Sequence, residues 1–110
     1  MKFARIDTIK ITDWESFHDV FIEVFGFPAY YGRNMNAWID CMTYLNEPGS
    51  SDLTFKADSG EIIVLDMIDV KAFKSRCPEQ YDAIIECSAF VKHRMTERGD
   101  PPILALSFYM

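Results

Sequence analysis

The sequence has little of several features that assign a protein to a class at once. Its three cysteines, Cys41, Cys77 and Cys87, are an odd number and lack the paired spacing of a zinc site. No run approaches the roughly 20 apolar residues of a membrane span, and the N-terminal MKFARIDTIKITDW lacks the apolar core of a secretory signal. These absences predict a reduced, cytosolic protein with no metal, no cofactor and no membrane association.

Basic residues are also scarce. Eleven Lys and Arg stand against 17 Asp and Glu, which gives a formal net charge of −6 and a pI near 4.7. Proteins that bind nucleic acid directly neutralise phosphates with Lys and Arg, so this balance argues against nucleic acid as a partner. The acidity favours encounter with a basic protein, although acidity alone is weak evidence for one.

The hydrophobic content is ordinary for a globular chain. The 110 residues are 49% hydrophobic and include nine Phe, five Tyr and two Trp, enough for a packed core. Domains commonly run to about 100–150 residues. We therefore expect one domain over residues 1–110, without internal repeats or linkers.

The first third of the chain predicts a strand followed by a helix. Residues 2–7 form the strand, and Thr12 with Glu15 fits a capping box at the start of the helix. Apolar residues then recur at helical spacing up to Gly26, which suits a left-handed helix stop.

A second helix is predicted from Asn34, an acceptable N-cap, to Pro48-Gly49. One face carries an apolar stripe: Met35, Trp38, Ile39, Met42 and Leu45. Another face carries Asn36, Asp40, Thr43 and Glu47, with Tyr44 one turn after Asp40. This second face is a candidate surface for contact with another molecule.

The remainder predicts two more strands and two more helices. Residues 61–67 and 103–108 are apolar strands, and a hairpin strand at 53–57 is possible. Asp69 is a candidate cap for a short helix through Ser75, and Cys77-Pro78 opens a longer helix that ends at Gly99. Helices between successive strands favour parallel pairing. We predict an α/β fold, with a small three-stranded parallel sheet and helices packed on it.

Enzymatic readings find little support. His18 and His93 lie on different predicted helices without a nucleophile at a suggestive spacing. Asp66 and Asp69 follow an apolar strand, where α/β enzymes often place catalytic acids. Strand termination and helix capping explain these two residues better, so a small enzyme is the least favoured hypothesis. The basic residues at 92–94 and 98 suit a helix C-terminus.

The stretch FPAYYGRNMNAWIDCM, residues 27–42, is the most distinctive part of the chain. From composition alone, Tyr30 and Tyr31 are expected to pack against the core, because most aromatic side chains do. The order of residues, however, resembles the signature of the barstar family, the intracellular inhibitors of small secreted ribonucleases such as barnase. The shared pattern is Pro-x-Tyr-Tyr-Gly-x-Asn, followed by Ala37 and by Asp40-Cys41 at the same spacing.

The resemblance implies a binding face made from this loop and the helix after it. Carried over by position, it implies these contact residues: Tyr30, Tyr31, Gly32, Asn34, Asn36, Ala37, Asp40, Thr43 and Tyr44. Asp40 would stand where an RNA phosphate sits in the ribonuclease, accepting charge-assisted hydrogen bonds from its cations. The implied function is one-to-one inhibition of a basic small ribonuclease or a related toxin protein, with no catalysis by the chain itself.

A different protein partner remains an alternative. Asn36 stands where the family usually has an aspartate. From Pro28 to Pro48 the acids Asp40 and Glu47 stand against Arg33, a net charge of −1. This nearly neutral face is also compatible with an immunity or binding module whose partner is not a ribonuclease.

Overall fold

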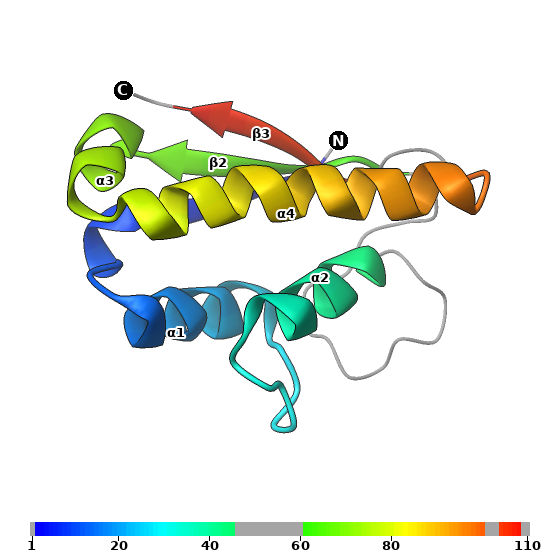
Figure 1. Cartoon of the computed structure of the whole chain (residues 1–110), viewed down its shortest axis with the longest axis horizontal. Coiled ribbons are helices and arrows are strands. Elements are labelled where there is room, and N and C mark those ends of the chain that lie inside the picture. Colours follow the sequence, from blue (N-terminus) through cyan, green and yellow to red (C-terminus); the bar gives the residue numbers. More distant parts are fainter. Residues whose placement is uncertain (1, 46–60, 101–103, 109–110) are drawn as a thin grey trace.

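The computed structural model describes residues 2–45, 61–100 and 104–108, and within them three strands form one parallel sheet (Figure 1). The strands are β1 (Lys2–Asp7), β2 (Ile63–Ile68) and β3 (Leu104–Phe108), in the order β1-β2-β3. Ile63 is in register with Lys2 on one side and Leu104 on the other. The predicted α/β class and parallel pairing are confirmed; the possible strand at 53–57 lies outside the described residues.

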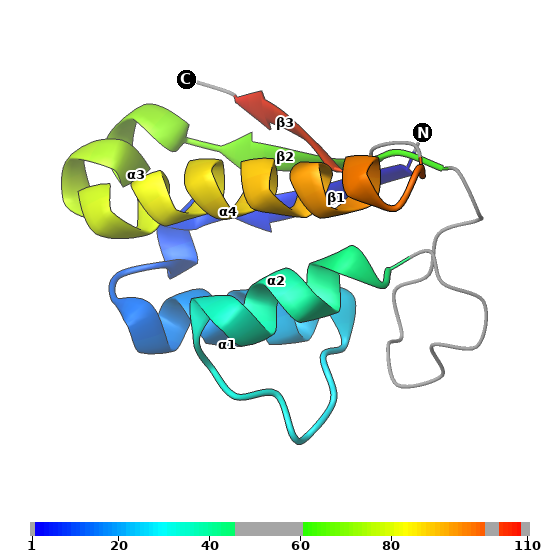
Figure 2. The ribbon, with the colours of Figure 1, turned by 45° about the vertical axis from the view of Figure 1, so that its right-hand side comes forward.

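The helices also follow the predicted order. They are α1 (Trp14–Phe25), α2 (Met35–Thr43), α3 (Val70–Arg76) and α4 (Pro78–Glu97), and a short 3₁₀ turn, η1 (Thr8–Lys10), follows β1. Both ribbon views show α4 between the strands β2 and β3 on one side and the pair α1 and α2 on the other (Figure 2). The end of α4 therefore lies beside α2, far away in sequence.

Helix α1 begins one residue later than predicted. The N-cap is Asp13, whose carboxylate accepts a hydrogen bond from the backbone N–H of Ser16 at 2.8 Å. In return the Ser16 hydroxyl accepts from the backbone N–H of Asp13 at 3.0 Å, which completes a capping box. The predicted box of Thr12 and Glu15 is wrong because Asp13 holds the extended backbone of the N-cap. The predicted left-handed stop at Gly26 is confirmed, with φ 67°.

The predicted boundaries of α3 and α4 are confirmed in part, with one correction at the start of α3. Asp69 occupies the N-cap position of α3, but its backbone is left-handed (φ 53°) and its side chain makes no capping hydrogen bond. The predicted side-chain cap is therefore wrong. Pro78 is the first residue of α4, as predicted, and Gly99 follows its end with φ 78°.

The core lies between the sheet and the helices. Ile6 of β1 and Leu65 of β2 are buried, as are Phe17 and Phe21 of α1 and Trp38 of α2. The rings of Phe21 and Trp38 meet edge to face, with centroids 5.6 Å apart. This contact fixes α2 on α1 and so holds one face of α2 inward, which decides which of its side chains reach the surface.

Candidate protein-binding face

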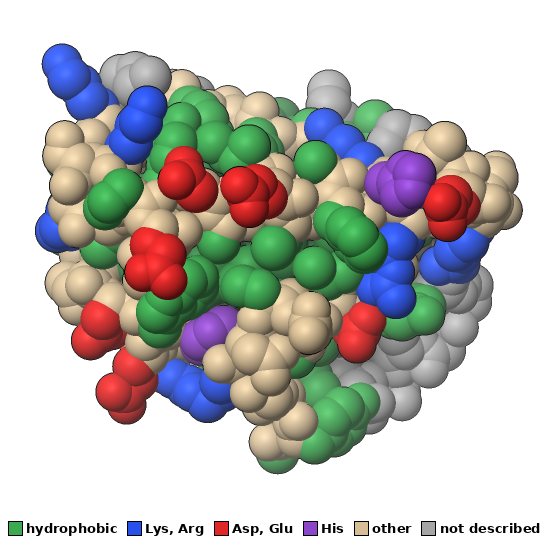
Figure 3. Space-filling model, viewed as in Figure 1, with side chains coloured by type: hydrophobic (Ala, Val, Ile, Leu, Met, Phe, Trp, Pro, Cys, Tyr) green, Lys and Arg blue, Asp and Glu red, His purple; other side chains and the backbone are tan. Residues whose placement is uncertain are grey.

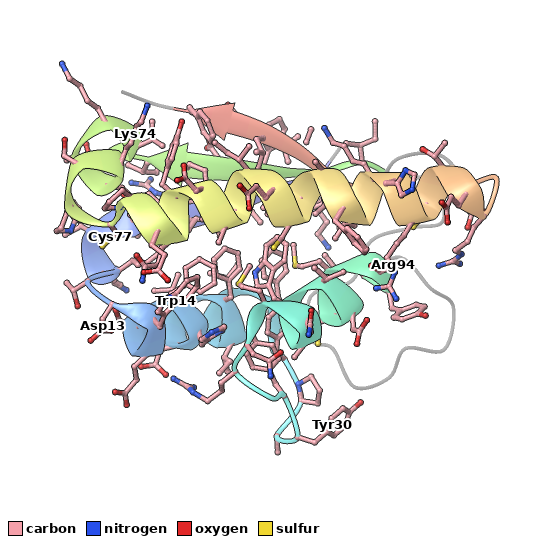
Figure 4. All side chains as sticks on the ribbon, viewed as in Figure 1. Asp13, Trp14, Tyr30, Lys74, Cys77 and Arg94 are labelled. Carbon is pink, nitrogen blue, oxygen red and sulfur yellow. The ribbon has the colours of Figure 1, made fainter. Side chains whose placement is uncertain are left out.

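The loop between α1 and α2 is anchored by aromatic stacking. Phe27 is buried, its ring stacked on Phe25 at a centroid distance of 5.9 Å and packed on Tyr31 at 4.7 Å. A tight turn brings the backbone N–H of Tyr31 to the carbonyl of Pro28 at 2.9 Å. Tyr30 lies on this turn and is 75% exposed, pointing away from the body of the protein (Figure 4). The two adjacent tyrosines therefore have opposite environments.

Tyr31 belongs to the core. Its side chain is 7% exposed, and its hydroxyl shares a 2.6 Å hydrogen bond with Nδ1 of the buried His18. Burial raises the pKa of the Tyr31 hydroxyl well above its ordinary value. Burial, and then the positive charge of Arg33, lower the pKa of His18. Two neutral groups joined by a buried hydrogen bond brace the loop, so we revise Tyr31 from a contact residue to a supporting one.

Arg33 also supports the loop. It has a left-handed backbone (φ 53°), which is uncommon for a residue with a side chain. Its guanidinium donates to the carbonyl of Glu15 and to the carboxylate of Asp19, each at 2.9 Å. The positive charge that the sequence places in this loop is therefore directed at α1 and balanced by Asp19.

Asn34 and Gly32 shape the entry into α2. The Asn34 side-chain oxygen accepts from the backbone N–H of Ala37 at 2.8 Å, which confirms the predicted N-cap. Its amide donates to the carbonyl of Gly32 at 3.2 Å. A Cβ at Gly32 would lie 3.1 Å from the Asn34 side-chain nitrogen and 3.6 Å from Cβ of Ala37. A glycine is therefore needed for this close approach, and residues 32–34 form a compact, exposed corner.

On α2, three predicted contact residues share one exposed side. Asn36, Asp40 and Tyr44 follow each other at intervals of one turn and are all exposed, Asp40 by 62% and Tyr44 by 45%. Thr43 is 1% exposed and donates its hydroxyl to the carbonyl of Ile39 at 2.6 Å. We therefore revise Thr43 to a supporting role, because a buried hydroxyl cannot reach a partner. The helix ends at Thr43, before the predicted end at Pro48-Gly49, which lies outside the described residues.

Asp40 has a partner within its own chain. Nη1 of Arg94, on α4, donates to Oδ1 of Asp40 at 2.9 Å, and Figure 4 shows Arg94 reaching toward the end of α2. The side chains are 36% and 62% exposed, respectively. An ion pair this exposed is worth about 0–1 kcal/mol, because water screens it. Asp40 therefore has only a weak partner within the chain and remains accessible to a visiting group.

Further charges surround this pair. The guanidinium of Arg98 lies over the ring of Tyr44, 5.8 Å from its centroid, and bonds Asp100 at 3.2 Å. Figure 3 shows side chains of both signs gathered at the end of α4 that lies nearest α2. Within the described ranges, acidic side chains are thus not concentrated around Asp40.

We define the loop–helix face as the seven predicted contact residues that are exposed or partly exposed: Tyr30, Gly32, Asn34, Asn36, Ala37, Asp40 and Tyr44. It combines a carboxylate, amides and aromatic rings on a braced scaffold. Cys41, next to Asp40, is partly buried; burial, and then the charge of Asp40, raise the pKa of its thiol to about 11. The thiol is therefore protonated at neutral pH, and a nucleophilic thiolate is not available there.

Other site chemistries have little to build on in the described residues. Over residues 2–45, 61–100 and 104–108, no three His, Cys, Asp or Glu side chains gather as a metal site would require. None of the helices in the same ranges has both the length and the hydrophobicity to cross a membrane. Asp66 lies within β2, in register with Arg5 and Ser107, and Asp69 stands at the start of α3.

Comparison with known proteins identifies the family. Residues 1–107 match the family described as Barstar (barnase inhibitor). The chain belongs to the barstar family. The match spans the loop–helix face, the four described helices and the sheet up to Ser107, so the barstar fold accounts for nearly all of the described structure. A comparison with curated proteins finds no match. The family description names inhibitors rather than enzymes.

Two residues of this barstar-family site were missed in the sequence. The sequence alone explains Arg94 by its place near a helix C-terminus, and for His18 it shows only that no nucleophile lies at a suggestive spacing. Only the packing of α4 beside α2 brings Arg94 to Asp40, across 54 residues of sequence. For His18 the helical spacing with Trp14 and Phe21 is a weak signal that it faces inward.

Proposed function

We propose that this barstar-family protein inhibits a small ribonuclease by covering its active site, one molecule to one, in the cytoplasm of the cell that makes it. The observation that supports this most is the position of Asp40. It is an accessible carboxylate on a helix, one turn before the exposed ring of Tyr44, and the exposed ring of Tyr30 lies on the loop that leads into the same helix.

The chemistry of a ribonuclease site explains why this arrangement would inhibit. Such a site holds cations where the RNA phosphate binds, and a carboxylate can accept the same charge-assisted hydrogen bonds. The rings would exclude water around the pair, which strengthens it by lowering the local dielectric. The face needs no rearrangement to present these groups, because Tyr31, Arg33 and Asn34 already brace the loop.

The first experiment measures inhibition of barnase and of related small secreted ribonucleases by the purified protein. Asp40→Asn keeps the shape of the side chain but removes its charge. Since hydrogen bonds to charged groups are worth about 1.5–3 kcal/mol, the variant should raise the dissociation constant at least tenfold. Asp82→Asn is the matched control, because Asp82 is an exposed acid on α4 and the change in net charge is the same.

Two results would contradict the proposal. One is the absence of binding to any ribonuclease of the panel by the unmodified protein. The other is equal weakening by Asp40→Asn and Asp82→Asn, which would mean that only the net charge matters. A direct charge pair should also associate more slowly as the salt concentration rises.

A partner other than a ribonuclease is the second candidate. The observation that favours it is the ion pair between Arg94 and Asp40, together with Asn36 in place of an acid. Such a face offers less negative charge to a cationic cleft. Affinity purification with the unmodified protein and with Tyr30→Ala would separate the two candidate functions. A partner that binds the unmodified protein, is lost with Tyr30→Ala and does not cleave RNA would favour the non-ribonuclease partner.

A further inference from the structure

Arg94 changes what the loop–helix face offers to a partner. It reaches Asp40 from α4, and the nearby Arg98 pairs with Asp100. The two arginines and two aspartates of these pairs sum to a formal charge of zero, so among the described residues neither pair adds net negative charge beside Asp40, although the whole chain carries −6. A surface meant to meet only cations would not be expected to place an arginine against its one acceptor carboxylate.

Binding would intensify the effect of Arg94. A partner cation that takes the second oxygen of Asp40 arrives within a few ångströms of the Arg94 guanidinium. In water this repulsion is weak, but an interface expels water and lowers the effective dielectric. Arg94 can turn away from an arriving cation only by giving up its hydrogen bond to Asp40, and its backbone stays in α4, which packs beside α2, so its charge remains near the interface. A purely cationic site should therefore bind this face poorly.

Arg94 also has hydrogen-bonding capacity left for a partner. The bond to Asp40 uses one N–H of Nη1, and a guanidinium carries further donors in a rigid fork suited to carboxylates. The side chain is 36% exposed, so a second acceptor can approach it from solvent. A partner carboxylate placed there would accept hydrogen bonds from Arg94. The partner cation, Asp40, Arg94 and the partner carboxylate would then alternate in charge, which offsets the repulsion between Arg94 and the partner cation.

From these observations we propose that Arg94 determines the specificity of the face, and that its cognate partner presents a carboxylate beside the cation that binds Asp40. The proposal rests on the proposed function and narrows it: the target is a ribonuclease whose phosphate site has an acidic group at its rim. Ribonucleases with wholly cationic rims should bind at least tenfold more weakly.

A competing effect works in the opposite direction. By favouring one rotamer of Asp40, Arg94 spares the side chain some ordering on binding, worth up to about fivefold in affinity. Repulsion between two cations about 5 Å apart in an interface that has lost part of its water lowers the binding affinity on the order of a hundredfold. Repulsion is the larger effect, so removal of the Arg94 charge should tighten binding to a purely cationic site by about tenfold.

The test uses barnase in which any acidic side chain at the phosphate site has been replaced by alanine, so that the site is purely cationic, and compares Arg94→Gln with the unmodified protein by calorimetry. We expect Arg94→Gln to bind about tenfold more tightly. Arg94→Lys, which keeps the charge, should bind like the unmodified protein. Lys92→Gln is the matched control, because it removes the same charge from the same helix. Lys92 lies two residues before Arg94, so its side chain points to the opposite side of α4.

A second arm tests the carboxylate. Single glutamates are introduced at successive rim positions of the barnase phosphate site. At one or more positions glutamate should tighten binding to the unmodified protein at least tenfold, and this gain should vanish with Arg94→Gln in a double-mutant cycle. Thermal unfolding of each variant checks that it is folded.

The outcomes separate the two proposals. If the unmodified protein binds and Arg94→Gln binds no more tightly, or Lys92→Gln tightens binding equally, the role of Arg94 is overturned while inhibition stands. If no rim glutamate is coupled to Arg94 in the double-mutant cycle, the proposal that the partner presents a carboxylate is overturned. If neither the unmodified protein nor Arg94→Gln binds any ribonuclease, the proposed function fails and this inference fails with it.

Discussion

The hydrogen bond between Tyr31 and His18 gives the most direct test of how the loop is braced. Tyr31→Phe removes the hydroxyl but keeps the ring, so the contact with Phe27 at 4.7 Å remains and no large cavity forms. The change deletes a buried 2.6 Å hydrogen bond and leaves Nδ1 of His18 without that partner. A buried polar group that loses its partner costs about 1–3 kcal/mol.

We therefore expect the free energy of unfolding to fall by about 2 kcal/mol. For a chain of this size that corresponds to a decrease in Tm of roughly 8 °C. Urea unfolding followed by circular dichroism measures the first quantity, and calorimetry the second. Tyr30→Phe is the matched control: it makes the same chemical change on the neighbouring residue, which is 75% exposed, and should alter stability by less than about 0.5 kcal/mol.

The refuting result is equally specific. If Tyr31→Phe and Tyr30→Phe have the same stability, the hydroxyl of Tyr31 does not brace the loop. A larger loss of partner affinity for Tyr31→Phe than for Tyr30→Ala, at full stability, would restore Tyr31 to the contact residues and contradict its burial.

Three further predictions concern the same region. The pKa of His18 is lowered in the folded protein, so below pH about 6.5 the unfolded chain takes up the proton more readily. Stability to urea should therefore fall as the pH drops from 6.5 toward the folded pKa. His18→Gln should remove this dependence, whereas His93→Gln, at an exposed position, should not. Asn34→Ala should destabilise the protein by about 1 kcal/mol through loss of the α2 cap, whereas Asn34→Asp should retain most of the stability in thermal unfolding. Gly32→Ala should displace the Asn34 side chain, 3.1 Å from the new Cβ, and its amide NMR shifts at residues 33–37 should change while those of β1 stay fixed.

Local patterns in the sequence carried the element order. The strand at Lys2–Asp7 and the helix starting after Asn34 follow from hydrophobic periodicity and capping chemistry, which depend on neighbours a few residues apart. The resemblance in residues 27–42 then identified the family. Where local chemistry offered two nearby solutions, the sequence was ambiguous: Thr12 and Asp13 are both good caps, and the backbone at Asp13 decides between them.

The sequence could not show which residues of the site are exposed for contact with a partner and which support the loop from within. Tyr30 and Tyr31 are chemically identical neighbours, yet one faces solvent and the other bonds His18, because the turn at Pro28 places them on opposite sides. Thr43 shares a predicted polar face with Asp40 but rotates far enough around α2 to be buried.

The sequence by itself determined the parallel α/β order, the capped second helix and the family. It also placed a carboxylate at position 40 on that helix. Only the tertiary structure decided what surrounds that carboxylate, because Arg94 is 54 residues away and reaches it through the packing of α4 beside α2. Helical periodicity is a property of one segment, whereas an ion pair between two helices depends on how both are rotated and docked.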